Sequence, residues 1–159
     1  MMNSRSEQTF RHLHNAILSN LNNMLQPRPY FKRGNNEVLN NCKEKYSTFV
    51  MASFTCENQQ CSKTGWKSGK VGILIRGYQN NGYHAIVFNQ RCATCKQLGD
   101  LKLDQSSYID RVSYRLKKWA GIDMGRPEWR EKKDTPPHKS HLCEGCGRGY
   151  CERSGASLY

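Results

Sequence analysis

Acidic residues are scarce in this chain of 159 residues: 13 Asp and Glu stand against 25 Lys and Arg, which gives a formal net charge of +12. Such an excess predicts attraction to polyanions, meaning nucleic acid, anionic lipid headgroups or an acidic partner protein. A solubilising surface charge is the alternative, and net charge does not identify the partner. We favour a polyanion.

Long hydrophobic runs are also missing. A membrane-spanning helix needs about 20 consecutive apolar residues, whereas the best run here covers only residues 49–54. The first residues lead into a polar amphipathic segment and not into the apolar stretch of an export signal. We therefore expect an intracellular protein, cytoplasmic with a nuclear location open. In that reducing compartment paired cysteines favour metal or redox chemistry over structural disulfides.

Several catalytic signatures are absent. The chain has neither a Walker-type phosphate loop nor a serine nucleophile elbow. The zinc deaminase signature requires a glutamate two residues after a histidine and a proline before a C-x-x-C pair. Here Ile86 stands two residues after His84, and Arg91 precedes Cys92. We expect a protein that is not an enzyme.

Hydrophobic periodicity predicts an α+β fold: a small antiparallel β-sheet with zinc knuckles, flanking helices and an N-terminal amphipathic helix. Strands are expected at 46–55, 71–78 and 83–90, the last two joined by a hairpin at Asn80-Asn81-Gly82. Along the third strand, alternate residues should face opposite sides of the sheet.

Two helices are predicted. The N-terminal one has a capping box at Ser4 and Glu7 and ends at Pro27 and Pro29. Its apolar stripe, which should dock on the domain, is Phe10, Leu13, Ile17, Leu21 and Met24. The second spans 108–120, with Ser107 as its cap. Its buried stripe is Ile109, Val112, Leu116 and Trp119.

The expected organisation has three parts. Residues 1–41 form the N-terminal helix and a polar linker, 42–152 a zinc-binding domain, and 153–159 a flexible tail. Only 36 % of the residues are hydrophobic. A modest apolar core of this kind needs additional help from metal or disulfides.

Cysteine spacing is the strongest signal in the chain. Cys56 and Cys61 follow the first strand, and Cys92 and Cys95 follow the third. A C-x2-C step brings two thiolates to one metal ion, and a sheet that joins two such pairs creates a tetrahedral four-sulfur zinc site. A thioredoxin-like redox pair would instead precede a helix, which the residues after Cys95 do not predict.

A second cluster contains Cys143, Cys146 and Cys151 and needs a fourth ligand. His138 and His141 can both reach, and the longer step favours His138. We therefore expect two structural Zn²⁺ ions, since each cluster counts four ligands and leaves no open position. Cys42 is left over and is expected to be a free thiol.

The ordered motifs resemble the 3CxxC zinc-finger family. Phe54-x-Cys56 with Trp66-x-Ser68 matches its opening, Phe88-x-Gln90-Arg91-Cys92 its centre, and Pro137-His138 with Cys143-Glu144-x-Cys146 its end. The family pattern has a histidine ahead of the last cysteine pair, which favours His138. Two departures are the C-x4-C spacing of the first pair and the lack of the C-terminal membrane segment typical of receptor-transporting proteins.

The resemblance implies two functions of different classes. Zygote-arrest proteins carry a related C-terminal domain that resembles an RNA-binding module, and receptor-transporting proteins assist the trafficking of membrane receptors. The stretch around Ile75-Arg76-Gly77-Tyr78 looks most like the fungal members of the family.

Binding of RNA or another single-stranded nucleic acid is our first hypothesis. Cations would contact phosphates and aromatic rings would stack on bases. The candidate residues are Arg111, Arg115, Lys117, Lys118, Arg126, Trp129, Arg130, Lys132 and Lys133. The alternative for the cations is a solvated helix face. Trp119, on the same helix, could stack on a base, and its alternative is a core position. The second hypothesis is a chaperone or adaptor for client proteins, with the stripe Leu13, Ile17 and Leu21 as a docking helix.

Overall fold

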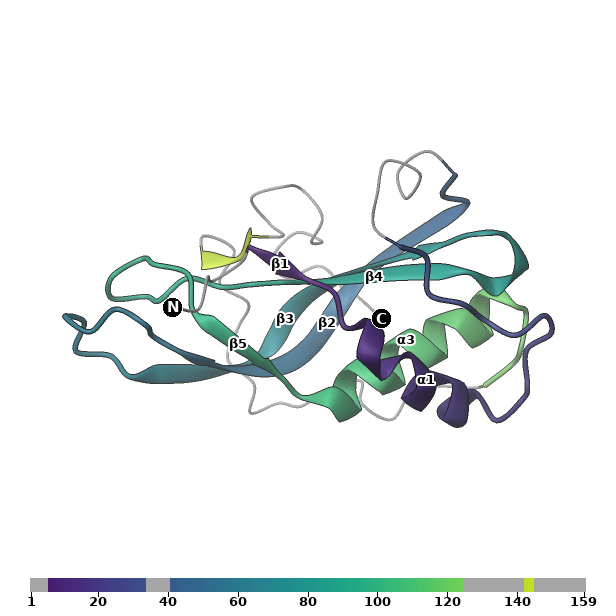
Figure 1. The fold of residues 1–159 in the computed structure, drawn as a ribbon, viewed down its shortest axis with the longest axis horizontal. Helices are drawn as coiled ribbons and strands as arrows, with labels where there is room; N and C mark the ends of the chain where they lie inside the picture. The colour runs from purple at the N-terminus through teal and green to yellow at the C-terminus, as the bar shows by residue number, and fades with distance from the viewer. Residues whose placement is uncertain (1–5, 34–40, 125–141, 145–159) are drawn as a thin grey trace.

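The structure is a computed structural model that describes residues 6–33, 41–124 and 142–144. Its centre is a five-stranded antiparallel sheet with the strand order β1-β4-β3-β2-β5 (Figure 1). The strands are β1 (Glu7–Gln8), β2 (Glu44–Thr55), β3 (Gly65–Gly77), β4 (Tyr83–Phe88) and β5 (Asp100–Leu103). The helices are η1 (Arg11–Leu13), α1 (His14–Leu21), η2 (Gln79–Asn81) and α3 (Gln105–Trp119). The α+β class with an antiparallel sheet is confirmed.

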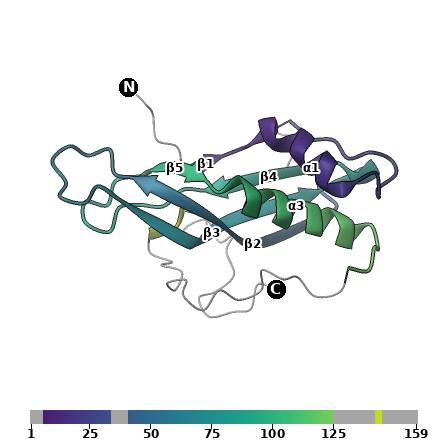
Figure 2. The same cartoon turned by 90° about the horizontal axis from the view of Figure 1, so that it is seen from below.

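The two α-helices lie on the same side of the sheet (Figure 2). Alternation along the strands explains why: β3 and β4 each direct every second residue toward the helices. The resulting core joins α1, α3 and the strands, with buried side chains at Leu13, Ile17, Leu21, Val50, Val71, Ile73, Ile75, Tyr83, Ala85, Val87, Tyr108, Val112 and Leu116. A smaller cluster of Leu74, Ile86 and Phe88 marks the opposite side, as predicted for the third strand.

The N-terminal segment differs from its prediction. Glu7 does not cap a helix, because it pairs with Phe88 in the edge strand β1. Ser4 lies outside the described residues. The α-helix has only eight residues and ends at Asn22, whose φ of 51° is left-handed, well before Pro27. Asparagine tolerates that conformation and therefore ends the helix before the prolines are reached. A long N-terminal amphipathic helix is therefore not confirmed.

The cap of α3 also differs. Asp104 is the N-cap residue, and its side chain accepts a hydrogen bond from the Ser106 amide at 3.1 Å. Ser107 lies inside the first turn, where its hydroxyl accepts from the Met51 amide at 3.0 Å and donates to the Asp104 carbonyl. This serine fastens α3 to β2 and does not start the helix.

The sheet is larger than predicted. The first half of β3 contains Gly65, Gly69 and two lysines and so lacks an apolar alternation, while β1 and β5 are short edge strands. The hairpin between β3 and β4 is confirmed, with Asn80 and Asn81 at positive φ.

The segment boundaries at residues 41 and 152 stay predictions, and 34–40 and 145–159 lie outside the described residues. Leu13, Ile17 and Leu21 lie in the same core as the strands, so the predicted docking of this stripe on the domain is observed. Met24, the last member of the stripe, is exposed, and Leu25 is buried in its place.

Candidate metal centre

The loops that follow β2 and β4 lie at the same end of the sheet (Figure 1). The strand order requires this arrangement, because β4 and β5 flank the hairpin formed by β3 and β2. The β4–β5 connection must therefore cross the end of that hairpin. In doing so it brings the second cysteine pair against the first, as the sequence predicted. We call this part of the molecule, residues 56–64 and 89–99, the cysteine end.

Four sulfur atoms converge there. The Sγ atoms of Cys56, Cys61, Cys92 and Cys95 all lie within 4.8 Å of one another. Cys56 Sγ is 3.6 Å from Cys95 Sγ, and Cys61 Sγ is 3.8 Å from Cys92 Sγ. A tetrahedral ion with Zn–S bonds of about 2.3 Å separates its sulfurs by about 3.8 Å, whereas a disulfide needs about 2.05 Å. The donor set and its spacing therefore fit one zinc ion.

Backbone hydrogen bonds shape both loops. In the first, the Cys61 amide donates to the Asn58 carbonyl at 3.0 Å, and the Asn58 side chain accepts from the Gln60 amide. This Asx turn lets the longer C-x4-C spacing close on one metal. In the second, the Cys92 amide donates to the Gln97 carbonyl and the Lys96 amide to the Cys92 carbonyl, both at 2.8 Å.

Lys96 completes the second loop in an uncommon conformation. Its φ is +66°, in the left-handed region that favours glycine or asparagine. Its ammonium donates to the Ala93 carbonyl at 2.7 Å, and its own carbonyl accepts from Arg91 at 3.0 Å. These contacts hold the turn that directs both sulfurs of the pair to one side.

The environment of the thiols prepares one pair for metal binding. Burial raises the pKa of the Cys92 thiol, but the amides of Cys95 and Thr94 and the neighbouring thiols outweigh it and lower that pKa to about 6. The Gln97 amide is the main cause that lowers the pKa of Cys95.

The other pair behaves in the opposite way. The Asn58 amide favours the thiolate of Cys56, yet burial and hydrogen bonds with the other thiols raise its pKa to about 12. The pKa of Cys61 is raised as well, because burial and the thiols of Cys92 and Cys95 outweigh the favourable Lys63 amide. Cys92 and Cys95 thus favour the thiolate form more than Cys56 and Cys61 do, and a bound metal ion would displace the protons of the latter pair.

Buried amide side chains connect the cysteine end to the sheet. Asn89 is fully buried, donates to the Gly99 carbonyl at 2.8 Å and accepts from the Gln90 amide at 2.7 Å. Gln90 accepts from Trp66 Nε1 at 3.1 Å and donates to Ser68 Oγ at 3.2 Å. A satisfied network of this kind fixes the strand end directly before Cys92. The motif around Gln90 gives no sign of this role, because its partners Trp66 and Ser68 lie on another strand.

Cys143 lies beside the same strand end. It forms an antiparallel bridge with Gln90 and is buried. On either side of it, the Arg91 amide donates to the Leu142 carbonyl and the Glu144 amide to the Asn89 carbonyl. Arg91 and Glu144 also form an ion pair at 2.7 Å. The other predicted members of the second cluster, His138, Cys146 and Cys151, lie outside the described residues, as does the alternative ligand His141.

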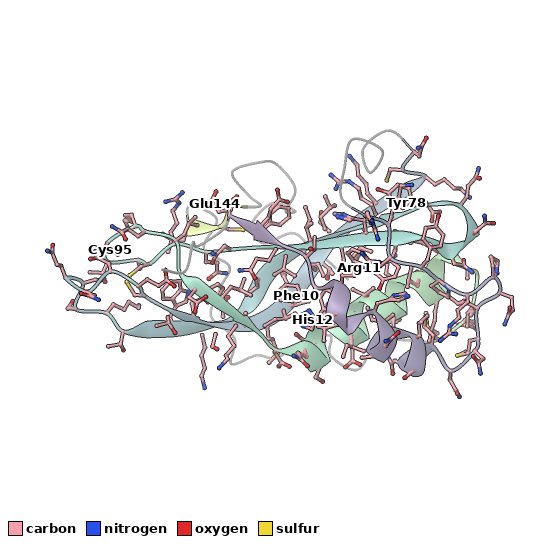
Figure 3. All side chains as sticks on the ribbon, viewed as in Figure 1. Phe10, Arg11, His12, Tyr78, Cys95 and Glu144 are labelled. Atoms are coloured by element: carbon pink, nitrogen blue, oxygen red, sulfur yellow. The ribbon has the colours of Figure 1, made fainter. Side chains whose placement is uncertain are left out.

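Cys42 lies apart from the four-cysteine cluster. It is a free thiol that donates to the Glu44 carbonyl at 3.0 Å. Figure 3 shows Cys95 at one extremity of the molecule and Tyr78 toward the other, and Cys42 lies close enough to Tyr78 to influence its pKa.

The predicted cations of α3 have unequal surroundings. Arg111 donates to Thr48 Oγ1 at 3.1 Å, and the Arg115 guanidinium lies 3.3 Å from the ring centroid of Tyr46. Both arginines thus reach across to β2. Lys117 is partly exposed and Lys118 is exposed. The remaining candidates, Arg126, Trp129, Arg130, Lys132 and Lys133, lie outside the described residues.

Trp119 lies at the core position that the sequence predicted for it. It packs against the core, and a Cβ added to Gly77 would lie 2.7 Å from its ring.

No helix among the described residues combines the length and the hydropathy that a membrane crossing requires.

Comparison with known proteins gives one family. The zinc-binding domain Zn_ribbon_3CxxC matches residues 49–149, which include the four converging cysteines and most of the sheet. No curated protein and no solved structure matches the chain. Because the match covers more than half of the sequence and the sulfur geometry fits zinc, the chain belongs to the 3CxxC family of zinc-binding domains.

Proposed function

We propose that this protein is a non-enzymatic, zinc-stabilised module that binds RNA or another single-stranded nucleic acid inside the cell. The observation that carries the proposal is the net charge of +12 on a chain whose zinc-binding domain brings together four cysteine sulfurs, enough to fill all positions of a tetrahedral ion. Catalytic zinc needs an open position for water or substrate. A site whose four positions are all filled by the protein has a structural role. The net positive charge of the chain then favours binding of a polyanion.

A titration at several salt concentrations tests this function. Fluorescence anisotropy of a labelled 20-nucleotide oligouridine should show binding whose affinity falls steeply with salt, because each neutralised phosphate of a single strand contributes about 0.7 to the slope of log K against log salt. An oligothymidine of the same length separates RNA from DNA preference. Absence of binding at low salt, or an affinity that ignores salt, would contradict the proposal.

The second zinc ion is part of the same proposal. Its ligands would be His138, Cys143, Cys146 and Cys151, and the burial of Cys143 beside Gln90 supports a closed site near the end of β4. Elemental analysis should give about two zinc ions per chain, since each structural site takes four ligands. His138→Ala should remove one equivalent and His141→Ala none. The reverse result would assign His141, and one zinc in the unmodified protein would contradict a second site.

The adaptor hypothesis has less support. Its docking helix depended on an accessible stripe at Leu13, Ile17 and Leu21, and all three side chains are buried against the sheet and α3. A partner could reach them only after α1 detached from the core. Nucleic-acid binding is therefore the function we propose.

A further inference from the structure

A row of polar side chains crosses three strands beside the cysteine end. Ser53 on β2 is the direct cross-strand partner of Lys67 on β3 and of Lys102 on β5. The next row along the strands, Phe54 with Trp66 and Leu101, belongs to the core on the helix side. Because successive residues of a strand alternate between the two faces, the Lys67–Ser53–Lys102 row projects from the face opposite the helices.

The two lysines of this row are available to a ligand. Both are exposed, and within the described part of the chain neither ammonium has an ion pair or hydrogen bond. Two strand intervals of about 4.8 Å place their Cα atoms about 10 Å apart. The small hydroxyl of Ser53 lies between them, so the row has two flexible cations around a shallow polar centre.

No acidic side chain among the described residues pairs with the lysines of the row. Asp100 and Asp104 each lie two residues from Lys102 along the chain: Asp100 pairs with Thr55, two rows along the strands from Ser53, and the Asp104 carboxylate accepts from the Ser106 amide as the N-cap of α3. Lys63 and Lys96 belong to the cysteine loops themselves, where they lie beside four thiolates that keep a net charge of about −2 with zinc bound. Lys67 and Lys102 instead lie on regular strands outside those loops.

The row also differs from the cations of α3. Arg111 is hydrogen-bonded to Thr48, and Arg115 covers the ring of Tyr46. A phosphate would have to compete with these contacts within the domain. Lys67 and Lys102 can neutralise phosphates without breaking any contact among the described residues, so binding there costs less free energy.

We propose that the Lys67–Ser53–Lys102 row contacts the sugar–phosphate backbone of the single-stranded nucleic acid. This inference rests on the proposed function and assigns part of its surface. The row contains ammonium groups and a hydroxyl but no aromatic ring, which is the chemistry of phosphate and sugar contacts and not of base recognition. It therefore contributes affinity that depends on salt and tolerates any sequence.

Charge-neutral variants test the assignment. The double variant Lys67→Gln with Lys102→Gln removes two phosphate contacts. The slope of log K against log salt should therefore become shallower, its magnitude decreasing by about 1.4. The matched control is Lys43→Gln with Lys45→Gln, which removes the same charge from two exposed lysines beside and within the opposite end of β2. The control should keep a slope within about 0.5 of the unmodified protein. Zinc content and far-ultraviolet circular dichroism confirm that both variants are folded.

The outcomes separate the two proposals. A slope whose magnitude decreases in the Lys67/Lys102 variant and stays unchanged in the control supports the row. Equal losses in the two variants would show that binding follows net charge alone, and no loss in either would place the interface elsewhere. Both results overturn the row and leave nucleic-acid binding intact. If the unmodified protein binds neither oligonucleotide, the proposed function fails and the row fails with it.

Discussion

The two ends of the sheet are stabilised by different means. Under α1 and α3, the sheet is held by apolar burial: Ile17, Val71 and Tyr108 are completely buried. At the cysteine end the strands run past the helices into loops whose cysteines, Cys92 apart, are only partly buried. Polar amides and a candidate metal ion replace the apolar core there. A domain of this size can therefore extend its sheet beyond its core when a metal ion closes the extension.

The largest expected effect comes from removing a ligand at the cysteine end. Cys92→Ala should weaken zinc binding more than about 100-fold, because even the loss of an outer-shell partner typically costs about 10–100-fold. Competition with a chromophoric chelator measures the affinity. Cys42→Ala is the matched control, since its thiol lies outside the cluster, and it should leave zinc affinity unchanged. An equal loss in both variants would show that the cluster is not the site.

Acidification should act on the same end. Cys56 and Cys61, whose pKa values are raised, must lose their protons to bind zinc, so the affinity for zinc should fall as the pH falls from 8 to 6. Below about pH 6 Cys92 is protonated as well. Protons then compete for one more sulfur, and the fall of log affinity per pH unit should become steeper below about pH 6. Chelator competition across pH measures this slope, and a slope near zero would contradict thiolate ligation.

A cavity in the helix-covered core should lower stability without affecting metal. Ile17→Ala removes a completely buried side chain between α1 and the sheet, and such truncations cost about 2–5 kcal/mol. Urea denaturation of the zinc-loaded protein measures the change, and elemental analysis should find the original zinc content. Loss of zinc in this variant would show that the two ends do not act separately.

The smallest expected effect concerns α3. Arg115→Ala removes the guanidinium from the face of Tyr46 and should cost about 1 kcal/mol, in the range of partly exposed cation–π contacts. Lys118→Ala on the exposed side of the same helix should change stability by less than about 0.5 kcal/mol. Equal effects in the two variants would show that the contact between Arg115 and Tyr46 does not stabilise the fold.

The sequence predicted well where periodicity or spacing is strict. Alternation placed Ile86 and Phe88 opposite Tyr83, Ala85 and Val87, as the two core clusters show. Cysteine spacing at strand ends predicted which four sulfurs converge. Both signals are local repeats whose geometry follows directly from the backbone.

Features that depend on tertiary partners could not be predicted in this way. Glu7 and Gln8 form a strand only because β4 offers a free edge. Asp104 rather than Ser107 caps α3, and the serine is used by β2 instead. The buried amides of Asn89 and Gln90 acquire their roles from Gly99, Trp66 and Ser68. In each case the deciding partner lies far away in the sequence or in another element.

Hydrogen exchange measured with and without zinc shows whether a metal ion holds the cysteine end together independently of the helix-covered core. Amides of Cys61, Cys92 and Gly99 are hydrogen-bonded inside the cysteine end, whereas those of 71–75 belong to the strand buried under the helices. Chelation should accelerate exchange at the three loop amides by at least about tenfold, while 71–75 change much less. Uniform acceleration along the whole chain, or no change at the loops, would contradict a separate, metal-held end.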